Sequence, residues 1–397
     1  MTYEQEYLTA LLRASLTASE PDETCRAVIE KINWDDFIKL SWAHKLVSYV
    51  YDTIVNIPDI PDGVSKYFEQ KTVTVVKQNF RLLFWAKNIL DRLAEVGADA
   101  VLLKGATAAV YYPNLLYRKS GDIDILIFDE DKLADVQKQM EALNYKKNET
   151  QSALHHVVFS NDEGIEVEIH TMLAEPFDNM KVNDMLDGLK NDIRESIVRK
   201  EILGIEIPVL REDYQAFELL LHMLQHYLRS GFGIRLLCDW VVFWNSDISE
   251  EISSGYSTLC DEFGVKQFSD MITQVCAVKL GLNRNEAANK FSDEDIEKFW
   301  NEFWVAEEFG KSSATRMVNL QGSKKSAYVK EFHHQMHLNF PKAGKCPLLW
   351  PVLWVITLVR FLVNNRRIRK VSLKDVLKSA GDRGKLNEKL HIFEDIS

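Results

Sequence analysis

The chain contains little cysteine, and its few cysteines are not arranged for metal or disulfide chemistry. Five cysteines are scattered over 397 residues, and no Cys-x-x-Cys pair occurs. A zinc ribbon and a disulfide framework are therefore not expected. We predict reduced thiols, most of them buried, in a cytoplasmic protein.

The chain also lacks an excess of basic charge. It has 48 lysine and arginine residues against 59 aspartate and glutamate residues, which gives a formal net charge of −11. Broad binding to nucleic acid requires basic surface that neutralises phosphates, so nucleic acid is not expected as the main partner. The N-terminal residues include acidic side chains and no basic stretch before an apolar run, so they do not resemble a secretory signal.

Only one apolar run raises the question of a membrane. Leu348 to Val363 falls short of the roughly 20 residues that a membrane-spanning helix needs, and it contains Pro351 and Arg360. Tryptophans within the run and basic residues after it resemble an interfacial anchor for anionic lipid: Trp350, Trp354, Arg366, Arg367, Arg369 and Lys370. A buried C-terminal helix is the alternative. Peripheral membrane contact through Leu348–Lys370 is therefore a hypothesis.

The rest of the chain has the composition of a globular protein. Hydrophobic residues make up 46% and charged residues 27%, and the length allows two or three packed units. Apolar residues recur at helical spacing in the first 95 residues and again after residue 212. We divide the chain into an N-terminal helical region (1–95), a core with a β-hairpin extension (96–211) and a larger C-terminal helical region (212–397).

The core shows short apolar runs bounded by glycine and charged residues, which predict buried strands. Turn formers at residues 161–164 indicate a hairpin between two of these strands. We expect strands at residues 100–103, 123–128, 156–160 and 165–170. Helices are expected at 107–112 and 131–143, and a second hairpin at 202–210. The prediction is an α+β fold, in which a small mixed β-sheet is flanked by the two helical regions.

Carboxylates cluster on two of the predicted strands. In Asp122-Ile123-Asp124 both acids project from one face of a strand. Their repulsion is relieved by a cation, and hard oxygen ligands of this kind suit Mg²⁺ or Mn²⁺. Glu166 and Glu168 also share a face, on a strand that ends at His170, and either could supply a third carboxylate. Three acids suffice for a two-metal site.

A second group of residues is placed to contact phosphates. Lys104 and Gly105 lie where a strand turns into a helix, so backbone N–H groups can face phosphate oxygens. Arg118 offers a planar guanidinium four residues before Asp122. We predict nucleotide contacts from Lys104, Gly105, Ala106, Arg118 and Gly121.

These motifs resemble the DNA polymerase β-like nucleotidyltransferase superfamily. Within it, the region from about residue 98 to 240 is similar to a bacterial family of uncharacterised nucleotidyltransferases. The residues that carry the resemblance are Leu-Lys-Gly-Ala at 103–106, Tyr-Pro at 112–113, Arg118, Asp-Ile-Asp at 122–124 and Glu-Ile-His at 168–170. The Gly-Ser or Gly-Gly usual in the superfamily is Gly105-Ala106 here, so a hydroxyl near the phosphates is absent.

The resemblance implies roles for residues outside the acidic motif. It favours Glu168 over Glu166 as the third metal ligand and possible base. It also points to His170, His222, His226, Arg235 and Asp239 at the substrate cleft. His222 and His226 have the spacing of two zinc ligands, but packing or substrate lining is the favoured interpretation because no glutamate lies between them. Arg235 and Asp239 could instead pair along one helix face.

The predicted reaction is metal-dependent transfer of a nucleoside monophosphate from a nucleoside triphosphate (NTP) to a hydroxyl of a small molecule, glycan or protein. One alternative is a catalytically weak or inactive fold that acts as a nucleotide-binding or regulatory module. Others are a toxin-like or antitoxin-like enzyme that modifies a protein, and a peripheral membrane protein of envelope polysaccharide synthesis. The sequence assigns neither the base of the NTP, nor the acceptor, nor the oligomeric state.

Overall fold

The computed structural model describes most of the chain. The described residues are all except 59, 151, 153–155, 230, 284–289, 308–324, 341–342, 344–345, 365–380, 382–383, 395 and 397. Of the predicted membrane-contact segment, Arg366, Arg367, Arg369 and Lys370 lie outside this set.

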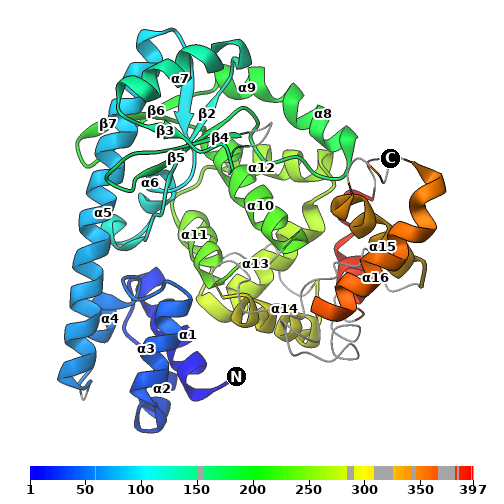
Figure 1. The fold of residues 1–397 in the computed structure, drawn as a ribbon. Helices are drawn as coiled ribbons and strands as arrows, with labels where there is room; N and C mark the ends of the chain where they lie inside the picture. Colours follow the sequence, from blue (N-terminus) through cyan, green and yellow to red (C-terminus); the bar gives the residue numbers. More distant parts are fainter. Residues whose placement is uncertain are drawn as a thin grey trace.

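The N-terminal region is helical, as predicted. Its helices are α1 (Tyr3–Thr17), α2 (Glu23–Val28), α3 (Trp34–Ala43), α4 (Tyr51–Ile54) and α5 (Asp62–Glu95). Pro58 and Pro61 lie between α4 and α5. With 34 residues, α5 is about 51 Å long, and it runs from the N-terminal helices to the sheet (Figure 1).

One mixed sheet forms the centre of the core. Its strands are β1 (Ala100–Leu102), β2 (Ile123–Ile127), β3 (Lys146–Lys147), β4 (His156–Ser160), β5 (Glu166–His170), β6 (Val198–Ile202) and β7 (Ile205–Val209). They lie in the order β3-β4-β5-β2-β1-β7-β6. The predicted strands are all present, and the α+β fold class is confirmed. The second hairpin begins at Val198 rather than at Ile202, and the short strand β3 was not predicted.

The helices of the core are short. They are α6 (Ala106–Ala109), α7 (Leu133–Ala142), α8 (Met180–Gly188) and α9 (Lys190–Glu195). The predicted helix at 107–112 is therefore a single turn, α6, and the one at 131–143 is α7 preceded by a 3-10 turn.

The two faces of the sheet bury different sets of side chains. On β2, Ile123, Ile125 and Ile127 pack with residues of α5 and α7. The alternate residue Leu126 packs into the other cluster, which includes α10 and α11 of the C-terminal region. Because side chains alternate along a strand, Asp124 shares the face of Leu126. The acidic motif therefore faces the C-terminal helices.

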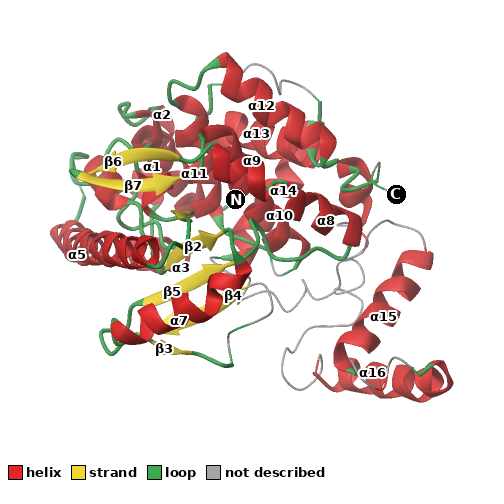
Figure 2. Cartoon of the chain, turned by 90° about the horizontal axis from the view of Figure 1, so that it is seen from above, coloured by secondary structure: helices red, strands yellow, loops and turns green. Residues whose placement is uncertain are grey.

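All regular structure among the described residues after Glu212 is helical, as predicted. The helices are α10 (Glu212–Leu228), α11 (Ile234–Asn245), α12 (Glu250–Glu262), α13 (Lys266–Leu280), α14 (Asp293–Ala306), α15 (Lys325–Asn339) and α16 (Trp350–Asn364). Figure 2 shows α15 and α16 at one side of the molecule, away from the sheet. No helix within the described part of the chain is both long and apolar enough to span a membrane.

The N-terminal and C-terminal helical regions share one hydrophobic cluster. Leu8 and Leu11 of α1 belong to the same cluster as Leu237 of α11 and Ile272 of α13. Arg13 of α1 also donates hydrogen bonds to the carbonyl of Lys279. The regions separated at residues 95 and 211 in the sequence are thus packed together in space.

The cysteines are free, as predicted. Four of the five are buried, namely Cys25, Cys238, Cys260 and Cys276, and Cys346 is exposed.

Candidate active site

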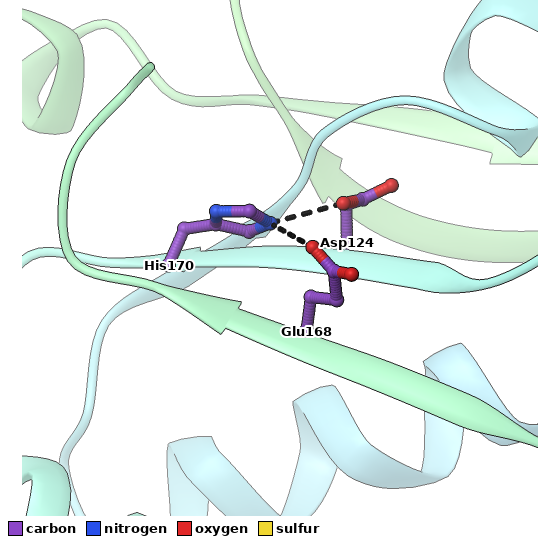
Figure 3. Close-up of side chains that lie close together, drawn as sticks. All are labelled: Asp124, Glu168 and His170. Atoms are coloured by element: carbon purple, nitrogen blue, oxygen red, sulfur yellow. Dashed lines mark hydrogen bonds and ion pairs between the residues drawn. The ribbon is translucent and has the colours of Figure 1, made fainter. Parts of the chain in front are cut away.

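Two adjacent parallel strands bring the carboxylates together. The register of β2 and β5 pairs Asp124 with Glu168 and Leu126 with His170. Paired residues on neighbouring strands point to the same face, so the carboxylates of Asp124 and Glu168 lie side by side beneath the C-terminal helices. Figure 3 shows both acids directed toward the imidazole of His170.

The centre of the site is a compact group of charged side chains. Nε2 of His170 lies 3.0 Å from Oδ1 of Asp124 and 3.4 Å from Oε2 of Glu168. Nζ of Lys104 lies 3.4 Å from the same Asp124 oxygen. One ligand atom from each of Asp124, Glu168 and His170 falls within 4.8 Å of the others. These three residues could therefore hold a metal ion.

The pKa values of this group reflect the competition between burial and charge. Burial raises the pKa of Asp124, but Lys104 and His170 outweigh it and hold the pKa well below its usual value. Burial lowers the pKa of His170, but its hydrogen bonds with Asp124 and Glu168 raise it to about 9. These contacts favour the ionised form of Asp124 and the protonated form of His170, whereas a His170 that binds metal must be neutral.

Asp122 directly precedes β2 and extends the acidic cluster. The charge of Asp124 and then burial raise the pKa of Asp122 to about 6, against the opposing effect of Lys104. Asp122 therefore resists ionisation next to the other carboxylates. A divalent cation near these oxygens would relieve the repulsion, so the donor set fits a hard metal ion. Lys104 and His170 also place positive charge beside Asp124.

Glu166 lies on the same face of β5, two residues before Glu168. Burial and the charge of Glu168 raise its pKa. The register places Val167 opposite Ile123, so Glu166 is level with the start of β2, whereas Glu168 is level with Asp124. The strand pairing favours Glu168 as the partner of Asp124.

Arg118 forms a buried pair with Asp239 on α11. Its Nε and Nη2 donate to the two carboxylate oxygens of Asp239, both at 2.8 Å, and the side chains are 4% and 1% exposed. Nη1 donates to Ser120 Oγ at 3.0 Å. The guanidinium therefore fixes the loop that leads to Asp122, although it also lines the cavity described below. The partner of Asp239 is thus Arg118, and Arg235 donates to the carbonyl of Lys119 at 3.0 Å.

The turn between β1 and α6 depends on a glycine. Gly105 has φ = 71° and ψ = −112°, a backbone conformation that favours glycine. Ser120 Oγ would lie 3.6 Å from an added Cβ, so the turn at Gly105 and the loop before Asp122 are neighbours. Because α6 has only four residues, the backbone N–H groups beside Gly105 belong to the turn and not to a long helix.

Helix α10 forms the opposite wall of the site. Nε2 of His222 and Nε2 of His226 lie 2.8 Å apart, so one ring donates to the other. Burial lowers the pKa of both, that of His226 to about 4. Neutral rings of this kind can exchange hydrogen bonds with a polar ligand.

Glu218 on α10 was not predicted. It is buried, and burial raises its pKa to about 7 although Lys104 acts in the opposite direction. The signal for it was present in the sequence, because Glu218, His222 and His226 recur at intervals of four residues and so share one helix face.

The two walls enclose one cavity of about 420 Å³, a size typical of small-ligand sites. Its lining includes all the predicted site residues except Ala106 and Asp239. Polar residues that the sequence did not single out line it as well: Lys119, Ser120, Glu175, Glu218, Gln225 and Arg229.

The sequence matches a known protein family. A sequence family described as "Uncharacterised nucleotidyltransferase" matches residues 30–281. None of the curated proteins compared with the chain matches it.

Three solved structures resemble the chain at low identity. An antigenic nucleotidyltransferase-like protein from Paracoccidioides brasiliensis is 14% identical, with 51% of this chain and 92% of that chain covered and a TM-score of 0.31. The lincomycin-bound lincosamide antibiotic adenylyltransferase LnuA is 15% identical, with 45% of this chain and 94% of that chain covered and a TM-score of 0.25. A CCA-adding enzyme in an apo form is 11% identical, with 81% of this chain and 96% of that chain covered and a TM-score of 0.29.

Proposed function

Because the chain belongs to the family of uncharacterised nucleotidyltransferases, we propose that it transfers a nucleoside monophosphate from an NTP to a hydroxyl of a second substrate, with Mg²⁺ or Mn²⁺ as cofactor. The observation that carries this proposal is the pairing of Asp124 with Glu168 across adjacent strands, with Asp122 ahead of them. The free cysteines support a cytoplasmic location.

Asp122, Asp124 and Glu168 would hold the metal. When bound, the metal would lower the pKa of the acceptor hydroxyl and neutralise charge on the triphosphate. Backbone groups of the turn at Gly105 and Ala106 and of the loop at Gly121 would orient phosphate oxygens, and Lys104 would place a positive charge beside them. Arg118 keeps this loop in place through Asp239.

In the reaction the acceptor oxygen bonds to the α-phosphorus, the bond from that phosphorus to the bridging oxygen breaks, and pyrophosphate leaves. The hydroxyl proton passes to a carboxylate of the site. Glu168 is one candidate, but a carboxylate that binds metal is a weaker base. Glu218 is the second candidate, because it lines the cavity and its pKa of about 7 suits proton transfer near neutral pH.

The test measures pyrophosphate release from each of the four NTPs with Mg²⁺, with the small-molecule fraction of a cell extract as the source of acceptors. We expect Asp124→Asn to abolish release, and Glu168→Gln to lower it by at least about 100-fold, because second-shell substitutions already cost roughly 10- to 100-fold. Glu166→Gln should stay within about tenfold of wild type. Asp135→Asn, an exposed acid on α7, is the matched control. Unchanged release by Asp124→Asn would contradict the proposal.

A nucleotide-binding module without turnover is the second candidate function. It is favoured by the internal cations His170 and Lys104, which already contact Asp124, and by the missing hydroxyl at Ala106. Calorimetry separates the two functions. Binding of an NTP with no pyrophosphate release under any acceptor mixture would support the module.

A further inference from the structure

The hairpin of α15 and α16 presents an apolar surface that the proposed reaction does not use. The two helices lie side by side at the edge of the molecule, apart from the sheet (Figures 1 and 2). The lining of the cavity includes no residue of α15 or α16. Trp354 Nε1 of α16 donates to His333 Nδ1 of α15 at 3.2 Å, and the rings of Trp350 and His333 are 4.6 Å apart. Leu353 and Thr357 are buried. These contacts fix which face of α16 meets α15.

The opposite face of α16 is apolar and exposed. Residues on it recur at intervals of three and four, so they form one stripe along the helix. The side chains of this stripe are 38 to 60% exposed, and they belong to Val352, Val355, Ile356, Val359 and Val363. A helix that is apolar on both its packed and its outer face is typical of a protein core or a membrane. A continuous apolar stripe on a surface marks an interaction site.

The sequence around this stripe is strongly basic. Residues 325–370 contain nine lysine and arginine residues and a single acid, a formal charge of +8. Since the whole chain carries −11, the remainder carries −19. Arg366 follows the last residue of α16 by two positions in the sequence. Four basic residues therefore follow the stripe in the sequence, namely Arg366, Arg367, Arg369 and Lys370.

The charge selects among the possible occupants. In a symmetric dimer through this face, each subunit would meet the same surface of the other, so two segments of charge +8 would adjoin and repel. An anionic lipid surface offers the opposite charge together with an apolar interior. With 15 residues, α16 is about 22 Å long, shorter than the roughly 30 Å hydrocarbon core, so it fits along the surface.

We propose that the outer face of α16 binds the surface of a bilayer rich in anionic lipid. The stripe from Val352 to Val363 enters the interface between headgroups and acyl chains, and the positive charge of residues 325–370 attracts the anionic headgroups. The site is independent of the catalytic cavity, and so of the proposed reaction.

The test is cosedimentation of the full chain with vesicles of phosphatidylcholine alone and of equal parts phosphatidylcholine and phosphatidylglycerol. We expect the wild type to bind the mixed vesicles at least about tenfold more tightly, and high salt to weaken binding. The double substitution Val355→Glu and Val359→Glu should weaken binding at least about tenfold. Val278→Glu on α13 is the matched control, since Val278 is also a valine about half exposed. Replacing Arg366, Arg367, Arg369 and Lys370 by Gln should remove the preference for phosphatidylglycerol.

Two outcomes would overturn the proposal. One is a wild-type chain that stays in the supernatant with both vesicles. The other is an outer-face variant, folded by circular dichroism, that binds as the wild type does. Sedimentation equilibrium tests whether a second copy of the chain binds this face instead. If the wild type is a dimer that does not bind vesicles, and the outer-face variant is a monomer, the face belongs to a second copy of the chain.

Discussion

Arg118 illustrates how a buried ion pair can hold the loop before Asp122 in place. Its ion pair with Asp239 is almost fully buried, and Tyr112 adds a hydrogen bond to the same carboxylate at 2.7 Å. The sequence identified both charges, but it could not pair them because they are 121 residues apart. Their contact depends on how α11 packs against the loop before β2.

We expect Arg118→Ala to lower the free energy of unfolding by about 3 to 5 kcal/mol, because it leaves the carboxylate of Asp239 buried without a counter-charge. The double variant Arg118→Ala, Asp239→Ala should recover part of this loss. Urea denaturation measures both, with Lys39→Ala as the control because Lys39 pairs with Asp36 on the surface. A loss below about 1 kcal/mol would mean that solvent reaches Asp239.

A second residue-scale prediction concerns His44, which is 1% exposed and packs against Trp304. Neither ring nitrogen has a hydrogen-bond partner among the described residues. Burial lowers its pKa from 6.5 to about 4. Below pH 6.5 the unfolded chain therefore binds a proton that the folded chain does not. The contribution of His44 to stability is complete above pH 6.5 and is lost as the pH falls toward 4.

Between pH 8 and pH 5 this difference amounts to about 2 kcal/mol of unfolding free energy. His44→Phe keeps an aromatic ring against Trp304 and removes the titration, so the variant should lose about 2 kcal/mol less than the wild type over this range. Urea denaturation at both pH values measures the difference. Parallel losses in the two proteins would show that His44 is hydrated.

At the scale of elements, the turn from β1 to α6 and the loop before β2 act together. The sequence predicted β2 and β5 from short apolar runs bounded by glycine and charged residues, and it placed the acids on one face of each. It could not provide their register, because that depends on which strands become neighbours. The parallel pairing of β2 with β5 is what favours Glu168 over Glu166.

A substitution at Gly105 tests whether the turn from β1 to α6 needs a glycine. We expect Gly105→Ala to destabilise the fold by about 1 to 3 kcal/mol, because its positive φ strains any residue with a Cβ. The KM for NTP should rise as the turn shifts. Gly63 in α5 is the control, since an added Cβ meets nothing within 4 Å and alanine favours the helix.

Thermal denaturation and NTP titration of the two glycine variants give the comparison. If Gly105→Ala unfolds at the wild-type temperature with an unchanged KM, the turn adapts freely and does not position phosphate.

At the scale of the whole molecule, the cavity lies between a sheet and a helical wall that are distant in the sequence. The α+β class and the helical flanks were predictable because local periodicity determines them. The strand order was not, since β7 joins β1 in parallel more than 100 residues downstream. Glu218 shares a helix face with His222 and His226 in the sequence, but only the packing of α10 opposite β2 and β5 brings it to the cavity.

The cavity also predicts a metal-dependent stability of the entire fold. Mn²⁺ or Mg²⁺ that binds only the folded chain stabilises it by about 2.7 kcal/mol at a concentration 100 times the Kd. We expect the melting temperature of the wild type to rise with metal, and that of Asp124→Asn to remain constant. Differential scanning calorimetry measures both, and equal shifts in the two proteins would place the metal elsewhere.

The contact of α1 with α13 has a consequence for synthesis of the chain. Arg13 and Lys279 are 266 residues apart, and at about 5 to 20 residues per second a ribosome needs roughly 10 to 50 s to make the intervening segment. During that time the leucines of α1 have no α11 or α13 to cover them. The nascent chain therefore carries an uncovered apolar helix face, to which chaperones can bind until the last part of the shared core emerges.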